Sequence, residues 1–212
     1  MSRSFVPYSS DIFNADIVDI ISALQPRSVC DIGPGAGKYG KILRQQADKM
    51  GFYTRITALE IDESYVEKFD LNSIYDEIII GDAITLLLSP RVRFDLVIMG
   101  DCIEHMRKSD AIDLLNFLTY RSAYICVIYP DEYVQDDWEG HAAEAHISIW
   151  HKHDFRKMRC LHSKWARSNL CLIRGFQPAT AKLGLMQGFG RLSAGKRALR
   201  RLRSIILHGK FR

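Results

Sequence analysis

The sequence predicts an α/β fold with a doubly wound, mostly parallel sheet of seven strands and an antiparallel C-terminal hairpin. Short apolar runs alternate with segments of helical periodicity from residue 11 to about residue 130, a pattern typical of repeated strand–helix units. Runs such as Phe94–Met99 are almost wholly apolar, as strands buried on both faces of a parallel sheet are. A chain of 212 residues is long enough for one such domain with a full core.

The first five strands follow this repeat in order. They are expected at Ser28–Ile32, Arg55–Ile61, Glu77–Ile80, Phe94–Met99 and Tyr124–Tyr129. Apolar side chains at every third or fourth position predict helices before and between them, at Asp11–Leu24, Lys38–Lys49, Ser64–Phe69 and Ser109–Leu118. After Asp154 the pattern changes. Met158–Lys164 and Leu170–Arg174 read as two strands joined by a short turn, which predicts an antiparallel hairpin at the sheet edge.

Composition favours a cytoplasmic protein. No apolar run approaches the roughly 20 residues that a membrane-spanning helix needs, and the N-terminus has no apolar core of the kind that secretion signals carry. The five cysteines are odd in number and widely spaced, with no Cys-x-x-Cys pair. We therefore expect reduced thiols and a cytoplasmic location.

The charge of the chain is divided unevenly. About 15 Lys and Arg residues follow Asp154 without one carboxylate, although the whole chain has a net charge of only +4. We expect a domain over residues 1–176 and a basic amphipathic helical extension over residues 177–212. In Leu192–Leu207 apolar residues share one helical face and basic residues occupy the others. This pattern favours a helix that lies on the inner face of an anionic membrane.

Other partners for this extension stay open. Nucleic acid is the competitor, but the sequence has no aromatic-rich stripe for stacking bases and no Asn-Pro-Pro-Tyr motif of base methylation. The extension could instead pack on its own domain or on a second subunit, and the sequence carries no signal for an oligomeric state.

The most specific motif is the glycine-rich segment Val29–Gly37, at the end of the first predicted strand. Glycines at positions 33, 35 and 37 let the backbone turn sharply and approach a ligand closely. A dinucleotide-binding loop would need its third glycine one place later, where Lys38 stands. A phosphate-binding P-loop would need Ser or Thr after Gly-Lys, and Tyr39 stands there. The spacing therefore indicates a different nucleoside ligand.

The pattern Asp31-x-Gly33-x-Gly35-x-Gly37 resembles motif I of the class I S-adenosyl-L-methionine (SAM)-dependent methyltransferases. Three later segments resemble the next motifs of that family in the same order. They are Ala58–Asp62, Gly81–Ala83 and Phe94–His105. The resemblance covers about residues 29–105 and implies a Rossmann-like fold, SAM as the cofactor and S-adenosyl-L-homocysteine (SAH) as its product.

The resemblance also implies which residues hold the cofactor. Glu60 would hold both ribose hydroxyls, and Asp82 with the backbone of Ala83 would contact the adenine. Asp31 would receive the methionine ammonium through the loop or a water molecule, or would only pin the loop. The three glycines, Ile61 and Asp101 complete the expected cofactor contacts. Carboxylates suit this task because anionic acceptors strengthen hydrogen bonds from hydroxyl and amino groups.

Two clusters offer candidates for a catalytic base. Asp101, Glu104 and His105 follow the fourth strand, and a histidine beside a carboxylate can accept a proton near neutral pH. The alternative is that the Glu-His pair only braces the strand end. The second cluster holds Glu144, His146, Ser148 and Trp150, whose period of two puts the four side chains on one face of an extended segment.

This second cluster predicts a polar pocket with His146 as the leading base and Glu144, Ser148 and Trp150 as substrate-binding residues. The competing interpretation is that His146 and Trp150 pack the loop against the sheet. The Glu-x-His-x-Ser-x-Trp element resembles a bacterial subgroup of these methyltransferases that is often linked to glycan modification. Members of this subgroup also carry Gly-Lys-Tyr-Gly, as residues 37–40 do, and begin like Pro7-Tyr8-Ser9.

The subgroup resemblance implies that Tyr8 and Lys38 reach the cofactor site. A metal site is not predicted, because His141, Glu144, His146, Glu104 and His105 show no recognised ligand spacing such as His-Glu-x-x-His.

The sequence therefore predicts a SAM-dependent methyltransferase that methylates an oxygen of a small polar, sugar or glycan-precursor acceptor. His146, His105 or Asp101 would take the proton. One alternative is an RNA methyltransferase that uses the basic extension, and another is a SAM-binding partner subunit without catalysis. A nicotinamide dehydrogenase is disfavoured by Lys38, which stands where that loop needs glycine.

Overall fold

The computed structural model describes residues 9–89, 91–136 and 142–179. Residues 180–212 of the predicted basic extension, Tyr8 and His141 lie outside these residues, so what the sequence analysis expects of them stays a prediction. No helix in the described part of the chain is long and apolar enough to cross a membrane.

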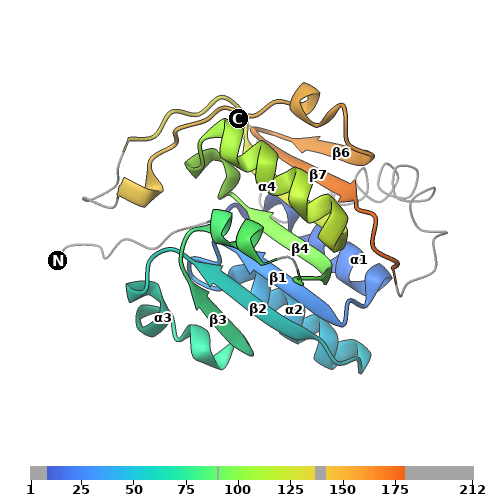
Figure 1. The fold of residues 1–212 in the computed structure, drawn as a ribbon. Coiled ribbons are helices and arrows are strands. Elements are labelled where there is room, and N and C mark those ends of the chain that lie inside the picture. Colours follow the sequence, from blue (N-terminus) through green and yellow to red (C-terminus); the bar gives the residue numbers. More distant parts are fainter. Residues whose placement is uncertain (1–8, 90, 137–141, 180–212) are drawn as a thin grey trace, which may run out of the picture. The chain divides into compact units, whose positions relative to one another are not determined.

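Seven strands form one sheet, and the predicted α/β fold is confirmed (Figure 1). The strands are β1 (Ser28–Ile32), β2 (Arg55–Glu60), β3 (Glu77–Ile80), β4 (Phe94–Gly100), β5 (Ser122–Pro130), β6 (Cys160–Trp165) and β7 (Ser168–Arg174). Their order across the sheet is β3-β2-β1-β4-β5-β7-β6. Strands β1 to β5 pair in parallel, whereas β7 runs antiparallel to both β5 and β6. The last two strands are the predicted hairpin.

The helices lie close to their predicted positions. They are α1 (Asn14–Leu24), α2 (Lys38–Met50), α3 (Ser64–Lys68) and α4 (Lys108–Arg121). Short 3₁₀ helices, none of which the sequence predicts, are η1 (Asp11–Phe13), η2 (Leu71–Ser73), η3 (Ala83–Leu88), η4 (Ile103–His105), η5 (Ala142–Glu144) and η6 (Lys152–Phe155). The first three residues of the predicted first helix form η1, where the side chain of Ser10 accepts a hydrogen bond from the backbone N–H of Ile12.

Helices cover both faces of the sheet. The contacting pair α1 and α2 lies behind it in Figure 1, and α4 lies in front. The apolar face of α4 buries Ala111, Leu114, Leu115 and Leu118 completely against the side chains of β1, β4 and β5. This burial of apolar area is the main source of stability for the layered arrangement.

The strand order reverses direction at β1. The chain proceeds from β1 outward through β2 to β3 and then returns to the other side of β1 as β4. In such sheets ligands bind in the crevice beyond the carboxyl ends of the strands at this switch point. The fold therefore predicts a ligand site at the carboxyl ends of β1, β2 and β4.

Candidate active site

A cavity of about 1030 Å³ lies at the switch point. Its walls are the glycine loop after β1, the ends of β2 and β4, the segment after β5 and the turn between β6 and β7. Ligand pockets for small molecules commonly measure about 300–1,000 Å³, so this cavity is large enough for a nucleoside ligand with a second molecule beside it.

The glycine loop passes close to β4. Gly33 and Gly35 line the cavity with φ angles of +66° and +51°, in the left-handed region that favours glycine. A Cβ atom on Gly33 would lie 2.8 Å from the Cβ atom of Cys102, so no larger residue fits there without a shift. Gly37 starts α2 with a φ of +75° and does not line the cavity.

Glu60 ends β2 with its carboxylate in the cavity wall. One oxygen accepts a hydrogen bond from the backbone N–H of Gly35 at 3.2 Å, and the other accepts from that of Asp62 at 2.9 Å. Burial raises the pKa of Glu60, and these N–H donors oppose the shift. Because a carboxylate offers about four acceptor positions, Glu60 keeps acceptor capacity for the hydroxyls of a bound ribose.

The residues after β3 form the next part of the wall. Asp82 caps η3 by accepting a hydrogen bond from the N–H of Ile84 at 2.9 Å, and Ala83 and Ile61 lie beside it in the cavity. The half-exposed apolar side chain of Ile61 and the carboxylate of Asp82 are groups that suit a purine ring with an amino substituent.

Asp31 lies outside the cavity wall. It is fully buried in β1, and the hydroxyl of Tyr75 donates to its carboxylate at 2.7 Å. Its strand neighbours Cys30 and Ile32 belong to the core cluster under α4, so the side chain of Asp31 points to the opposite face of the sheet. This geometry fits the pinning role of Asp31 and offers no direct contact with a ligand.

Lys38 connects the cavity to the N-terminal segment. Its Nζ donates to the carbonyl oxygens of Ser9 and Ser10 at 2.9 and 2.6 Å and lies 3.2 Å from the carboxylate of Asp11. Burial lowers the pKa of Lys38, and the pairing with Asp11 opposes the shift. Lys38 therefore holds residues 9–11 at the edge of the cavity.

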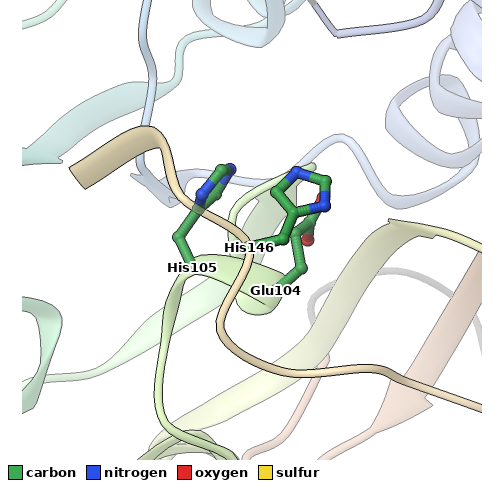
Figure 2. A group of neighbouring side chains, drawn as sticks. All are labelled: Glu104, His105 and His146. Atoms are coloured by element: carbon green, nitrogen blue, oxygen red, sulfur yellow. The ribbon is translucent and has the colours of Figure 1, made fainter. Parts of the chain in front are cut away.

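The three predicted proton acceptors come together in the cavity wall. Asp101 follows β4 with a φ of +50°, a strained conformation that clusters at functional sites. His105 comes from η4 and His146 from the segment after β5, and their rings meet edge to face with centroids 4.8 Å apart. All three residues line the cavity together with Glu104. Figure 2 shows Glu104 and His105 on one short helix and His146 on the neighbouring segment.

Segment 145–150 is fixed to η4 by backbone bonds. The carbonyl oxygen of Glu104 accepts from the N–H groups of Ile147 and Ser148 at 2.9 and 3.0 Å. The Nδ1 of His105 lies 3.0 Å from the carbonyl oxygen of Ala145. Burial lowers the pKa of His105, and this carbonyl opposes the shift. These contacts explain how residues separated by about 40 positions become neighbours.

The Glu-x-His-x-Ser-x-Trp element divides between two roles. Glu144 and His146 line the cavity, and Glu144 accepts a hydrogen bond from the hydroxyl of Tyr65 at 2.9 Å. Ser148 and Trp150 do not line it. Trp150 is 3% exposed, and its Nε1 donates to Ser148 Oγ at 2.8 Å and to the carbonyl of Ile103 at 3.2 Å. In this geometry Ser148 and Trp150 pack against η4 and lie outside the cavity wall, as the competing interpretation expects, and their substrate-binding role stays a prediction.

Replacing Trp150 by alanine is therefore expected to lower the free energy of unfolding by about 3–5 kcal/mol. The indole ring packs against Phe155 at 5.6 Å between centroids, and its removal leaves a cavity in the core. Urea unfolding of the variant measures the change. Trp165→Ala is the matched control, because Trp165 is 38% exposed on β6. A Trp150→Ala variant that unfolds like the wild type but no longer binds the acceptor would contradict this expectation and would assign Trp150 to the substrate site.

Several lining residues carry no motif that the sequence could have revealed. Tyr65, Arg107, Tyr133, Gln135 and Arg167 all face the cavity. They lie in loops or at element ends, where only the folded topology decides which side chains converge.

Several solved structures with a similar fold are methyltransferases. The N-terminal domain of EvdMO1, solved in the presence of SAH and D-fucose, is 16% identical over 80% of this chain and 85% of its own, with a TM-score of 0.57. A SAM-dependent methyltransferase from Archaeoglobus fulgidus is 16% identical over 77% of this chain and 93% of its own (TM-score 0.56). Human N-acetylserotonin methyltransferase in complex with SAM is 17% identical over 78% of this chain and 52% of its own (TM-score 0.55).

At these identities the likeness shows a shared Rossmann-like methyltransferase fold. No protein-family model matches the sequence, and no curated protein matches it at a significant level. The chain spans only about half the length of the human enzyme.

Proposed function

We propose that this protein is a SAM-dependent methyltransferase. The observation that carries the proposal is the carboxylate of Glu60, which ends β2 in the cavity wall and touches the glycine loop. Asp82 and Ile61 stand beside it, where a purine would extend from the ribose. Structural neighbours of the same fold are solved with SAH or SAM, which supports the same cofactor here.

The residues present fit this cofactor. Glu60 would hold the ribose, Asp82 and Ala83 the adenine, and Gly33 and Gly35 the methionine part next to the loop. SAM supplies a methyl group on a positively charged sulfur that already carries its leaving group. The protein then has two tasks, which are to position an acceptor in line and to accept one proton.

We propose O-methylation of a small polar or sugar-containing acceptor. SAM would supply the methyl group to the acceptor oxygen and leave as SAH, and the protein would accept the hydroxyl proton. Asp101, His105 and His146 lie together at the cavity wall as candidates for that proton. Gln135, Glu144 and Arg167 add hydrogen-bonding groups to the same wall, which suits a hydroxyl-rich acceptor.

A calorimetric titration of the purified chain tests the cofactor. SAM and SAH are each expected to bind one site with micromolar affinity, and NAD is the control that is expected not to bind. Absence of SAM and SAH binding by well-folded protein would refute the proposal.

Transfer of a labelled methyl group to nucleotide sugars and lipid-linked glycans then tests the acceptor class. Transfer that is unchanged in His146→Ala, His105→Ala and Asp101→Ala, singly and together, would contradict the proton-acceptor assignment. SAM binding without transfer to any acceptor would favour the partner-subunit alternative. Methylation of RNA with an affinity that falls steeply with salt would favour the nucleic-acid alternative.

A further inference from the structure

We propose that Glu104, His105 and His146 form a binding site for a divalent first-row metal ion of the Zn²⁺ type. The sequence predicts no metal site, because Glu104 and His105 are adjacent and His146 follows 41 positions later. The fold creates the site by fastening segment 145–150 onto η4.

The three side chains have the composition and spacing that such an ion requires. One ligand atom from each residue lies within 4.8 Å of the other two. Figure 2 shows the carboxylate and both imidazole rings gathered at one place. Tetrahedral ligand bonds of about 2.0–2.2 Å hold neighbouring donor atoms about 3.3–3.6 Å apart, so side-chain rotations that close the widest separation by about 1.5 Å would complete the site. Two histidines and one carboxylate are a donor set that Zn²⁺ and similar ions accept.

Both histidines are held in the form that binds metal. His105 Nδ1 lies 3.0 Å from the carbonyl oxygen of Ala145, and His146 Nδ1 lies 2.9 Å from that of Tyr133. A carbonyl oxygen only accepts hydrogen bonds, so each Nδ1 carries the proton when the ring is neutral. Each Nε2 keeps its lone pair in this tautomer, although the ring of His105 also meets the backbone carbonyl of Asp101. Backbone carbonyls that fix the second ring nitrogen in this way are typical of metal-ligating histidines.

The third ligand supplies an independent observation. Glu104 lines the cavity yet is 3% exposed, and its Oε2 has no hydrogen-bond partner within the described part of the chain. A buried carboxylate oxygen without a partner is costly. A cation held between this oxygen and the two imidazoles would remove that cost. The arrangement therefore calls for a positive charge at this point.

The position of the site suggests its use, and this step rests on the proposed function. The cluster lies in the cavity wall beyond β4, with Asp101, whereas Glu60 and Asp82, which would hold the nucleoside, follow β2 and β3 on the other side of β1. A metal ion there would bind the acceptor hydroxyl and lower its pKa, so that the oxygen attacks more readily. Because His105 and His146 would then hold the ion, the hydroxyl proton would pass to Asp101, which lines the same cavity.

The test is a titration of the untagged, chelator-treated full chain with Zn²⁺ in a calorimeter and with Co²⁺ in an absorption spectrometer, without SAM or acceptor. One equivalent is expected to bind, with the visible absorption bands of Co²⁺ bound to nitrogen and oxygen ligands. His146→Ala and Glu104→Gln are each expected to weaken binding by about 100-fold. His153→Ala is the matched control and should leave binding unchanged, because His153 is exposed and lies outside the cluster.

Glu104→Gln keeps the size of the side chain, and thermal unfolding of each variant without metal separates lost ligands from lost folding. No saturable binding, or binding that is indifferent to His146→Ala and Glu104→Gln in folded protein, would overturn the inference. SAM binding measured on the same samples separates the two proposals. Protein that binds SAM but no metal would refute only the metal site, and protein that binds metal but no SAM would refute only the proposed function.

Discussion

Replacing Glu60 by glutamine is expected to weaken SAM and SAH binding by about 100-fold or more. A hydrogen bond to a charged acceptor contributes roughly 1.5–3 kcal/mol, and a carboxylate at this position would accept two from the ribose hydroxyls. Glutamine also presents an amide NH₂ to one of the backbone N–H groups of Gly35 and Asp62, which both donate to Glu60 in the native protein. Two donors facing each other would push the glycine loop from its place.

Calorimetric titration of Glu60→Gln with both ligands provides the measurement. Glu67→Gln is the matched control, because Glu67 is an exposed carboxylate on α3, outside the cavity wall. The affinity of the Glu67→Gln variant for SAM and SAH should equal that of the wild type. A folded Glu60→Gln variant that binds SAM with wild-type affinity would mean that the ribose lies elsewhere, and the position of the nucleoside in the cavity would have to be revised.

The position of Glu60 could be predicted because it depends on local sequence and on a rule of topology. An acid that ends a buried strand next to the glycine-bearing strand must lie at the ligand-binding edge of a parallel sheet. The same reasoning brings Asp82 and Asp101 to this edge, and the structure places both in the cavity wall. The strands themselves were predictable because apolar runs and helical periodicity are strong signals in this chain.

The roles of Ser148 and Trp150 could not be predicted in the same way. A period of two shows that side chains share one face of an extended segment, but it does not show what that face meets. Here the C-terminal half of the face packs on the backbone of Ile103, whereas Glu144 and His146 reach the cavity. The bonds that decide this belong to η4, a 3₁₀ helix too short to leave a periodic signal.

Asp31 shows a further limit of motif reasoning. The glycine motif places this acid beside the loop, but its partner Tyr75 lies 44 positions later and follows η2, which no pattern predicts. Once paired and buried, Asp31 affects the protein mainly through stability, and this effect depends on pH.

Replacing Asp31 by asparagine is expected to remove much of the pH dependence of stability between about pH 4 and pH 7. Burial raises the pKa of Asp31 to about 7, although the hydroxyl of Tyr75 opposes the shift. In the unfolded chain the pKa of an aspartate is about 3.9. Between these values the folded protein holds a proton that the unfolded chain has lost. The stability contributed by the protonated carboxyl is therefore complete below about pH 4 and is lost as the pH rises through about 7.

The free energy of unfolding of the variant should therefore be close to that of the wild type near pH 4.5 and should exceed it at pH 8 by about 2–4 kcal/mol. The upper figure follows from the difference between the two pKa values. The amide oxygen of the Asp31→Asn side chain would still accept from Tyr75, so the packing is kept. Urea unfolding from pH 4.5 to 8 measures the slope, with Asp48→Asn on the exposed face of α2 as the control. Other buried carboxyls remain in both proteins, so the difference between them isolates Asp31. An unchanged slope would mean that Asp31 is ionised in the folded state at all these pH values, and its burial would then have to be balanced by a positive charge.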